Sequence, residues 1–491
     1  MENVNVTFLP HGISISVTPG TTILQAQITA GLHPDAPCGG KGTCGKCTVE
    51  LDGKTVLACQ IKVKENMTVV LPQRENTTIL TDSLTASIHP DGLHDYAAAF
   101  DIGTTTVVGF LMDGKTGELL ATASAMNPQT RYGADVIARI EAVLADSGQA
   151  LQECILQTLE HLLAELSAQC RISANRISLV SIVGNTAMHH LLLGIDPKSL
   201  VTPPYMPAVR EAMQIPAAPL LPIHPEGTLR ILPNIAGFVG ADTVACMTAV
   251  DFGSLEELTL MIDIGTNGEM VLGNRDRRIA CSTAAGPAFE GAKISMGMRG
   301  SPGAIDHVWI KEGRLCHHTI GGVAALGICG SGLLDLVACL LELEILDESG
   351  YLEGKQYTIP DTAVTLTQKD IREVQLAKAA IRAGIELMCE HLSVQPKDIH
   401  TVLLAGAFGN YMDPRAACRI GMIPPVLLER IKPIGNAAGA GARCCAVSRD
   451  AYEYSKQLAE QTEFLELASK PEFQDQFVDA LEFYEEDEDD F

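Results

Sequence analysis

The sequence predicts an α/β multidomain protein with a small β-rich domain at the N-terminus and a larger domain built as two similar lobes. A β-rich pattern with a loop of cysteines and glycines opens the chain, and a strand–Asp–Ile–Gly–Thr–strand pattern then occurs twice. Long stretches with helical spacing, such as 134–166 and 370–392, lie between and after the two copies. The chain has 491 residues, 46% of them hydrophobic and 44 of them glycine, as expected for aliphatic cores with many tight strand-to-helix turns.

The N-terminal pattern is that of a small sheet with one helix. Segments 3–9 and 13–18 alternate apolar and polar residues around a tight turn, as the strands of a hairpin do. Helical spacing follows over 21–32, and a second hairpin turns at Asp52-Gly53. Together with the cysteine loop, these elements make a compact unit.

Domain boundaries follow from where the patterns change. We expect the small domain over 1–74, a linker without sustained periodicity over 75–96, the larger domain over 97–484 and a solvated acidic tail over 485–491. Within the larger domain, lobe I begins near residue 97 and lobe II near residue 258.

The repeated motif defines the two lobes. "YAAAFDIGTTTVVGFLMD" contains Asp101 and Gly103, and "LTLMIDIGTNGEMVLG" contains Asp263 and Gly265 at the matching places. The two copies lie 162 residues apart. Repetition at the scale of a domain indicates an ancient duplication, with two similar lobes that face one another.

Four cysteines of the small domain have the spacing C-x5-C-x2-C-x11-C: Cys38, Cys44, Cys47 and Cys59. Zinc is the alternative, but structural zinc sites commonly pair two C-x2-C knuckles and this segment has one. An iron–sulfur cluster needs a loop that wraps around it, and the glycines of "CGGKGTCGKC" permit that close approach. The pattern resembles the adrenodoxin-like variant of the ferredoxin fold, which implies a β-grasp domain with a [2Fe–2S] cluster on these cysteines.

The other cysteines have no ligand spacing. Buried thiols are the favoured interpretation for them. A second cluster between protomers, using for example Cys281 or Cys329, is the alternative.

The two Asp-Ile-Gly-Thr turns are expected to bind phosphate groups. A strand that ends in Asp and continues as Gly-Thr brings backbone N–H groups and hydroxyls together in a tight turn, with the carboxylate nearby to hold hydrated Mg²⁺. Plain turn chemistry is the alternative. We expect Asp101 and Asp263 to position Mg²⁺. The residues expected on the phosphates are Gly103, Thr104, Thr105, Thr106, Gly265, Thr266, Asn267 and Gly268.

Two further glycine turns follow apolar segments. One consists of Gly406, Ala407, Phe408 and Gly409 and suits the nucleoside side. The other, Gly330, Ser331 and Gly332, precedes a helical pattern and is expected on the nucleotide or at the lobe hinge. With the repeated motif, these turns resemble the phosphate-1, phosphate-2 and adenosine motifs of the actin, sugar kinase and Hsp70 (ASKHA) superfamily. This resemblance implies a duplicated, two-lobed, actin-like ATPase domain, and no P-loop motif is present.

Asp242, in "FVGADTVACM", lies where a strand is expected to turn into a helix. It resembles the aspartate that orients the nucleophile in related kinases, which would make it catalytic together with Asp101 and Asp263. A helix N-cap is an equally good interpretation.

Several longer segments extend the resemblance. "IVGNTAMHHLLLGI", "IAGFVGAD", "STAAGPAFEGAKISMGMRG" and "GICGSGLLD", taken with the N-terminal domain, resemble the reductive activators of corrinoid proteins. That family couples ATP to reduction of an inactive cob(II)alamin centre to cob(I)alamin in methyltransferase systems. The segment ahead of the actin-like part is short, so we expect the family's middle domain to be reduced or missing.

The resemblance implies an ATP-hydrolysing iron–sulfur reductase that acts on the corrinoid protein of a methyltransferase system, with a homodimer as a possible assembly. It does not identify the upstream electron donor. A formal charge of −25 argues against nucleic acid or an anionic membrane as partners. The odd number of cysteines and the absence of a signal-like N-terminus predict a reduced, cytoplasmic protein.

Two other functions are alternatives for a protein with this ATPase domain. An activator of a radical dehydratase or ring reductase would commonly carry a [4Fe–4S] cluster inside an actin-like dimer, and the N-terminal ferredoxin pattern argues against it. A redox-sensing regulator would use the cluster to gate nucleotide-dependent binding. His189 and His190 lie in an apolar helical stretch, where core or surface histidines are favoured over cobalt ligands.

Overall fold

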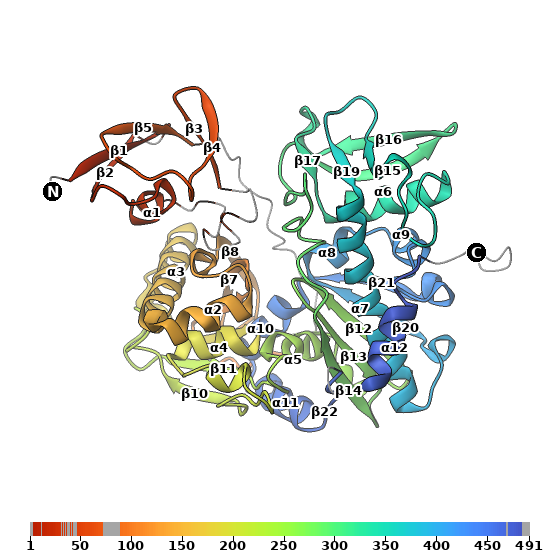
Figure 1. The fold of residues 1–491 in the computed structure, drawn as a ribbon. Coiled ribbons are helices and arrows are strands. Elements are labelled where there is room, and N and C mark those ends of the chain that lie inside the picture. The colour runs from red at the N-terminus through yellow and green to blue at the C-terminus, as the bar shows by residue number, and fades with distance from the viewer. Residues whose placement is uncertain are drawn as a thin grey trace.

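The computed structural model describes residues 3–10, 12–30, 32, 34, 36, 40, 42, 47–71, 89–467 and 470–483. In Figure 1 the N-terminal sheet domain, in red, lies beside two larger lobes, one in orange and yellow and the other in green and blue. Within the described residues no helix is long and apolar enough to cross a membrane.

The strands are β1 (Val4–Leu9), β2 (Ile13–Val17), β3 (Thr48–Leu51), β4 (Lys54–Leu57), β5 (Met67–Val70), β6 (Tyr96–Ile102), β7 (Thr106–Asp113), β8 (Leu119–Met126), β9 (Ile177–Gly184), β10 (Met213–Pro216) and β11 (Thr228–Ile231). They continue as β12 (Thr259–Ile264), β13 (Gly268–Gly273), β14 (Arg278–Thr283), β15 (Ala304–Lys311), β16 (Arg314–Thr319), β17 (Gly327–Ile328), β18 (Gln356–Thr358), β19 (Thr365–Thr367), β20 (Thr401–Ala405), β21 (Ile431–Gly435) and β22 (Glu463–Phe464).

The helices are α1 (Ile23–Thr29), α2 (Val136–Ala142), α3 (Gly148–Gln169), α4 (Thr186–Leu193), α5 (Ala241–Ala249) and α6 (Gly330–Glu342). They continue as α7 (Gln368–Leu392), α8 (Gly406–Tyr411), α9 (Pro414–Arg419), α10 (Ala437–Val447), α11 (Arg449–Glu460) and α12 (Pro471–Asp479).

The N-terminal domain has the predicted β-grasp arrangement. Its sheet runs β2-β1-β5-β3-β4, and β1 pairs antiparallel with β2 and parallel with β5. Helix α1 begins after Thr22, whose side chain accepts a hydrogen bond from the N–H of Gln25. Asp52 and Gly53 both have positive φ, at 51° and 75°, as a type I′ hairpin turn requires.

The two lobes share one sheet topology. The sheet of lobe I runs β10-β11-β9-β6-β7-β8, and that of lobe II runs β21-β20-β12-β13-β14-β22. Strands β6, β7, β8, β9 and β11 therefore correspond in order to β12, β13, β14, β20 and β21. This correspondence confirms the duplication that the repeated motif predicts, because each motif joins the first two strands of its own lobe.

Helices α5 and α10 cross between the two sheets, as the centre of Figure 1 shows. A Cβ on Gly441 would overlap the carbonyl oxygen of Ala245, so the crossing needs a glycine there. Apolar side chains from both sheets join these helices in one core, for example Ala99 from β6 and Met261 from β12. The lobes are therefore coupled through a shared core, although α10 follows the last long strand of lobe II.

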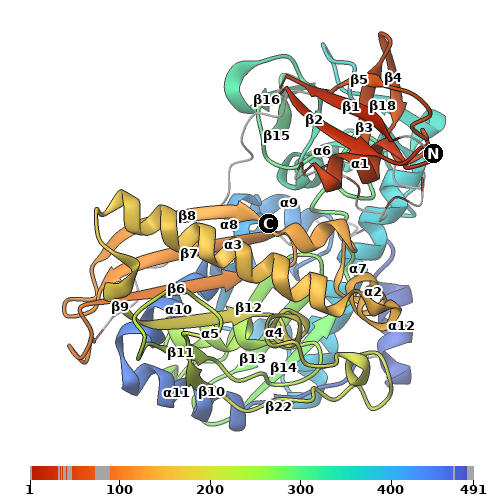
Figure 2. The same ribbon diagram turned by 90° about the vertical axis from the view of Figure 1, so that its left-hand side faces the viewer.

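The predicted helical stretch 134–166 is divided in the structure. Helix α2 ends at Ala142 and α3 begins at Gly148, because Asp146 has φ 74° and interrupts the helical backbone. Figure 2 shows α3 lying across the outer face of the lobe I sheet. The second predicted stretch forms α7, which starts with a capping box of Thr367 and Asp370.

A small sheet of order β16-β15-β17 is inserted between β14 and α7. In both Figures 1 and 2 it lies at the same end of the molecule as the N-terminal domain. Of the predicted linker, residues 75–88 lie outside the described residues. Residues 89–95 contact the larger domain, since the N–H of Asp91 donates to the carbonyl of Val447. The predicted acidic tail lies outside the described residues as well.

Candidate functional site

Four carboxylates gather where the two lobes face each other. Asp101 stands near the end of β6, Asp263 near the end of β12, and Asp242 in the first turn of α5. Glu269, on β13, is the direct cross-strand partner of Asp263. Like charges opposite one another destabilise a sheet, so this pair is a feature that folding alone would not favour.

The pKa values of these carboxylates reflect their proximity. Removal from water, followed by the charge of Asp242, raises the pKa of both Asp101 and Asp263 to about 7, and Asp263 adds to the effect on Asp101. Removal from water also raises the pKa of Asp242 to about 6. The pKa of Glu269 is raised well above its ordinary value, first by desolvation and then by Asp242 and Asp263.

Carboxylate oxygens suit a hard divalent cation such as Mg²⁺, which usually keeps several of its waters. Within the described residues, no three carboxylate, histidine or cysteine side chains are arranged to hold a metal ion directly, so a cation here would be a hydrated one. A cation among the four groups would favour their charged forms and offset the repulsion that raises their pKa values. Asn436, the N-cap of α10, already acts in this direction through a hydrogen bond to Asp101. The Cys246 thiol, with Sγ 4.0 Å from Oδ2 of Asp263, has a pKa raised by desolvation and by these carboxylates, so it stays protonated.

Asp242 does not cap its helix. The N-cap of α5 is Gly240, and Asp242 lies one residue inside the helix, where its Oδ1 accepts a 2.8 Å hydrogen bond from the N–H of Thr243. The N-cap interpretation of Asp242 is therefore wrong. The strand expected just before it ends earlier, at Ile231, and irregular backbone leads from there to α5.

Hydrogen bonds behind the first turn hold its carbonyl groups. The Asn127 side chain donates to the carbonyl of Gly103 over 2.8 Å, and the Asn127 backbone N–H donates to the carbonyl of Thr105, also over 2.8 Å. The N–H of Gly103 closes the turn on the carbonyl of Thr106. Peptide N–H and C=O groups point in opposite directions, so carbonyls held from behind leave N–H groups for the site.

Arg139 supports the same turn and was not foreseen from the sequence. It is fully buried, and its guanidinium donates to the carbonyl groups of Thr104 and Gly133. Burial lowers its pKa to about 10, so it remains charged. Asn185, from "IVGNTAMHHLLLGI", donates to the Thr104 hydroxyl over 3.0 Å.

The second turn is one residue shorter than the first. Ile264 pairs with Gly268, whereas Ile102 pairs with Val107, so three residues rather than four span the second turn. The N–H of Gly265 donates to the carbonyl of Asn267. The Asn267 side chain makes a hydrogen bond with Glu269 and so ties this turn to the carboxylate group.

The two turns meet at Glu290. Its Oε2 accepts a 3.3 Å hydrogen bond from the Thr105 hydroxyl, and its Oε1 accepts a 3.0 Å hydrogen bond from the Thr266 hydroxyl. One carboxylate therefore contacts a threonine from each lobe. The sequence interpretation missed this residue, although it lies within the quoted segment "STAAGPAFEGAKISMGMRG".

The third glycine turn lies beside the second. Ala405 of β20 is paired with Asp263, and Gly406 follows with φ 80°, as the first residue of the short helix α8. A Cβ on Gly406 would stand 2.5 Å from Oδ1 of Asp263. The Phe408 ring stacks on Phe289 with centroids 4.8 Å apart.

The turn at 330–332 is a packing feature of the start of α6. A Cβ on Gly330 would overlap the carbonyl oxygen of Phe289, and one on Gly332 that of Ile305. The Ser331 hydroxyl donates to the carbonyl of Asp306 over 2.8 Å. These contacts account for both glycines, and a nucleotide contact of this turn stays a prediction.

Two of the four expected cluster ligands fall within the described residues. Cys47 is buried, and its carbonyl accepts a 2.7 Å hydrogen bond from the N–H of Ala58, the neighbour of Cys59. Gly40, with φ 83°, lies near Cys59, since a Cβ added to Gly40 would lie 3.8 Å from the Cβ of Cys59. Gly40 therefore lies close to the last cysteine, which fits a cluster held between these positions. Cys38 and Cys44 lie outside the described residues.

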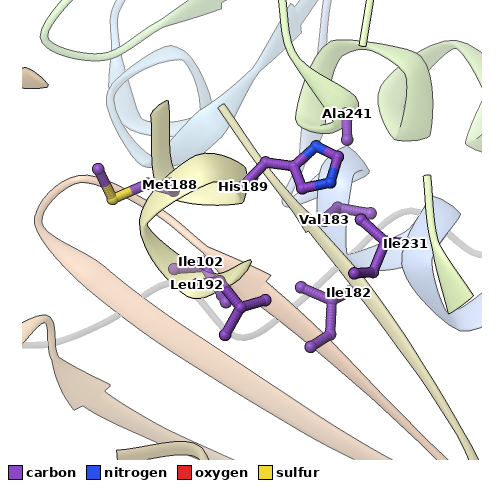
Figure 3. Close-up of a pocket in the computed structure, with 9 residues that line it drawn as sticks. Ile102, Ile182, Val183, Met188, His189, Leu192, Ile231 and Ala241 are labelled. Carbon is purple, nitrogen blue, oxygen red and sulfur yellow. The ribbon is translucent and has the colours of Figure 1, made fainter. Parts of the chain in front are cut away.

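The two neighbouring histidines are core residues. His190 Nδ1 lies 2.7 Å from the carbonyl of Thr186, and its Nε2 accepts from the N–H of Ala208. His189 Nδ1 lies 2.6 Å from the Asn234 amide nitrogen. Figure 3 shows the His189 ring at a small cavity that apolar side chains otherwise line. Of the two structural interpretations, core and surface, the structure shows the core one.

The thiols named as candidates for a second cluster are also buried in the core. Cys281 contacts the sulfur of Met388, and the Cys329 thiol donates to the carbonyl of Ile305. Both belong to apolar surroundings in lobe II.

Three family profiles match consecutive parts of the chain. The 2Fe-2S iron-sulfur cluster binding domain matches residues 6–64, the RACo middle region matches 96–254, and the C-terminal domain of RACo, the ASKHA domain, matches 257–491. The middle region is therefore present as lobe I, and the expectation that it is reduced or missing is wrong. Its strands repeat the topology of the ASKHA domain, so nothing in the sequence pattern sets it apart.

Two curated proteins and one solved structure are similar over most of the chain. The corrinoid activation enzyme RamQ of Eubacterium limosum is 30% identical, over 94% of this chain and 96% of the relative. A [Co(II) methylated amine-specific corrinoid protein] reductase of Methanosarcina barkeri is 27% identical, over 79% of this chain and 77% of its own length. A structure of a reductive activator for corrinoid, iron-sulfur protein has 28% identity and a TM-score of 0.72, covering 98% of both chains.

Proposed function

Since the chain belongs to the family of reductive activators of corrinoid proteins, we propose that it couples ATP to the reduction of a corrinoid protein. In this reaction one electron from the iron–sulfur cluster converts inactive cob(II)alamin to cob(I)alamin and restores methyl transfer. The observation that carries the proposal is the meeting of the two Asp-Ile-Gly-Thr turns at the lobe interface, in a chain that also bears a ferredoxin-like domain.

Mg-ATP is the nucleotide that this interface suits. Asp101 and Asp263, with Asp242 and Glu269 beside them, would hold the cation through carboxylate oxygens. The backbone N–H groups of the two turns, apart from those of Gly103 and Gly265 that close the turns themselves, would bind phosphate oxygens. The nucleoside would lie toward Gly406 and the rest of the third turn, which adjoins Asp263.

ATP is needed because the electron transfer is uphill. Plant-type clusters have potentials near about −400 mV, and the Co(I) state of a corrinoid is harder to reach. In a one-electron step, each increment of roughly 59 mV changes the equilibrium tenfold. ATP can help only by favouring a conformation in which the partner's cobalt is easier to reduce.

The fold offers a way to transmit that conformational change. Helices α5 and α10 cross between the sheets, and each begins at a carboxylate of the site, α5 with Asp242 and α10 with Asn436 beside Asp101. Closure of the lobes on the nucleotide would act on this shared core and grip the corrinoid protein.

The cluster is proposed to be of the [2Fe–2S] type, held by Cys38, Cys44, Cys47 and Cys59, and to supply one electron at low potential. The corrinoid partner would belong to a methyltransferase system. A cytoplasmic location and a homodimer remain predictions.

One mixing experiment tests the function. The protein with its cluster reduced is combined with a cob(II)alamin protein, and the Co(I) absorbance is followed with Mg-ATP, with Mg-ADP and without nucleotide. We expect Co(I) to form only with Mg-ATP. Equal Co(I) formation in all three mixtures, or none in any, contradicts the proposal.

A further inference from the structure

We propose that Glu290 is the general base of ATP hydrolysis in this protein, a role that rests on the proposed function. Among the described residues, Glu290 is the carboxylate that receives hydrogen bonds from threonines of both phosphate turns. A general base must lie within hydrogen-bond reach of the water that attacks the terminal phosphate. Glu290 lies between the two turns that are proposed to hold that phosphate.

The threonine hydroxyls orient this carboxylate. Thr105 donates to Oε2 and Thr266 to Oε1, so the plane of the carboxylate is set from both lobes. Phosphate contacts of the two turns then go through backbone N–H groups, which the bonds behind the first turn leave available. The Glu290 carboxylate consequently accepts hydrogen bonds from the threonine hydroxyls, and the phosphate accepts them from backbone N–H groups of the same turns.

Local contacts hold the backbone around Glu290. The N–H of Glu290 donates to the carbonyl of Pro287 over 3.2 Å, which forms a tight turn. The preceding residue, Phe289, is buried, stacks on Phe408 and lies against Gly330. A base fixed on such a support keeps its geometry when the nucleotide enters.

The other carboxylates of the site are less suited to this role. Beyond the effect of desolvation, the charge of Asp242 raises the pKa values of Asp101 and Asp263, and Asp263 adds to the effect on Asp101, so these carboxylates are grouped where a cation would offset their repulsion. A carboxylate that binds a cation has less free lone-pair capacity to accept a proton. Glu290 stands apart from them, bonded to the threonine hydroxyls.

The reaction balances with water as the only co-reactant. A water oxygen forms a bond to the γ-phosphorus while the bond from that phosphorus to the β–γ bridging oxygen breaks. Glu290 takes a proton from the attacking water, and ADP leaves with the bridging oxygen. Inorganic phosphate then departs, and Glu290 returns its proton to solvent.

The test separates nucleotide binding from hydrolysis in the full-length protein with its cluster. For Glu290→Gln we expect the Kd for Mg-ATP to stay within about threefold of wild type while kcat for hydrolysis falls about 100-fold or more. Glu290→Ala should show the same loss and recover about tenfold in added formate, which supplies a carboxylate. The matched control is Glu256→Gln, an exposed glutamate paired with Arg275, which should leave both quantities unchanged.

Three results would overturn the role of Glu290. If Glu290→Gln hydrolyses ATP with the wild-type kcat, Glu290 is not the general base. If Glu290→Gln binds ATP at least tenfold more tightly and still hydrolyses it, the Glu290 carboxylate only occupies the phosphate position when no nucleotide is bound. If Glu290→Gln neither binds ATP nor shows a cooperative thermal unfolding transition, Glu290 has a structural role. A wild-type protein that does not hydrolyse ATP contradicts the proposed function instead.

Discussion

Asp263 and Glu269 stand directly opposite each other on the antiparallel strands β12 and β13, two carboxylates in one cross-strand pair. The matching position in lobe I pairs Asp101 with Val108, so only lobe II has a second acid there. The duplicated lobes are therefore unequal at the site. Lobe I supplies its second carboxylate from a helix instead, as Asp242 of α5, so a cation at the site would interact with two carboxylates from each lobe.

The first prediction concerns pH and the metal-free protein. The pKa values of Asp101 and Asp263 are raised to about 7 from an ordinary 3.8, so the folded state binds these protons more tightly than the unfolded state. The free energy of unfolding should therefore fall as the pH rises from about 4 to about 7 and change little above that range. Thermal unfolding midpoints measured between pH 5 and 8 check this expectation.

Asp263→Asn should flatten that pH dependence and raise the midpoint at pH 8, because it removes one repelling charge. The matched control is Asp276→Asn, whose side chain is 81% exposed, and it should keep the wild-type slope. Equal slopes in both variants would show that the pH dependence comes from the net charge of the chain and not from the site.

The second prediction separates the ATPase from the cluster. Asp263→Ala should lower ATP hydrolysis and ATP-dependent corrinoid reduction about 100-fold or more, since it removes a charge that positions the cation. The visible spectrum of the cluster should not change, because the cysteines lie in another domain. Loss of the spectrum in this variant would indicate a folding role for Asp263.

The third prediction uses two glycines with the same backbone conformation. Gly406 and Gly313 have φ of 80° and 73°, but only Gly406 has a neighbour, since its Cβ would stand 2.5 Å from Asp263. Gly313→Ala should cost about 1 kcal/mol of unfolding free energy from backbone strain alone. Gly406→Ala should cost a further ~1 to 3 kcal/mol and weaken ATP binding about tenfold.

Thermal unfolding and an equilibrium titration with Mg-ATP measure both quantities for this pair. Equal losses of stability and unchanged ATP binding in the two variants would mean that Gly406 is needed only for its φ.

The fourth prediction concerns the cluster ligands. Cys47→Ser should abolish the visible absorption and lower the iron content, because a serine oxygen replaces one of the four thiolates. ATP hydrolysis without a corrinoid partner should persist. Cys170→Ser, at the C-cap of α3 in lobe I, is the matched control and should keep iron, absorption and hydrolysis. Bound zinc in place of iron in the wild-type protein would contradict the cluster assignment.

Much of the fold was predictable because local patterns report on it directly. Strand alternation and the Asp52-Gly53 turn are local, and each appears in the structure where expected. The break at Asp146 was not predictable, since the apolar spacing of 134–166 runs through it unchanged. Glu290, Arg139 and Asn436 were missed for another reason: each contacts a turn from a distant segment, and no spacing rule connects them to it.

The sequence by itself determined the elements and their chemistry: a cysteine loop with cluster spacing, two copies of one phosphate turn, and aliphatic segments that must be buried. Tertiary structure alone decided which of these groups meet. Hydrogen bonds and charge interactions act over a few ångströms in space and not along the chain, so only folding could bring Thr105 and Thr266 to one carboxylate. The same reason brings Asp242 of α5 close to Asp101 of β6 and Asp263 of β12, which belong to other segments of the chain.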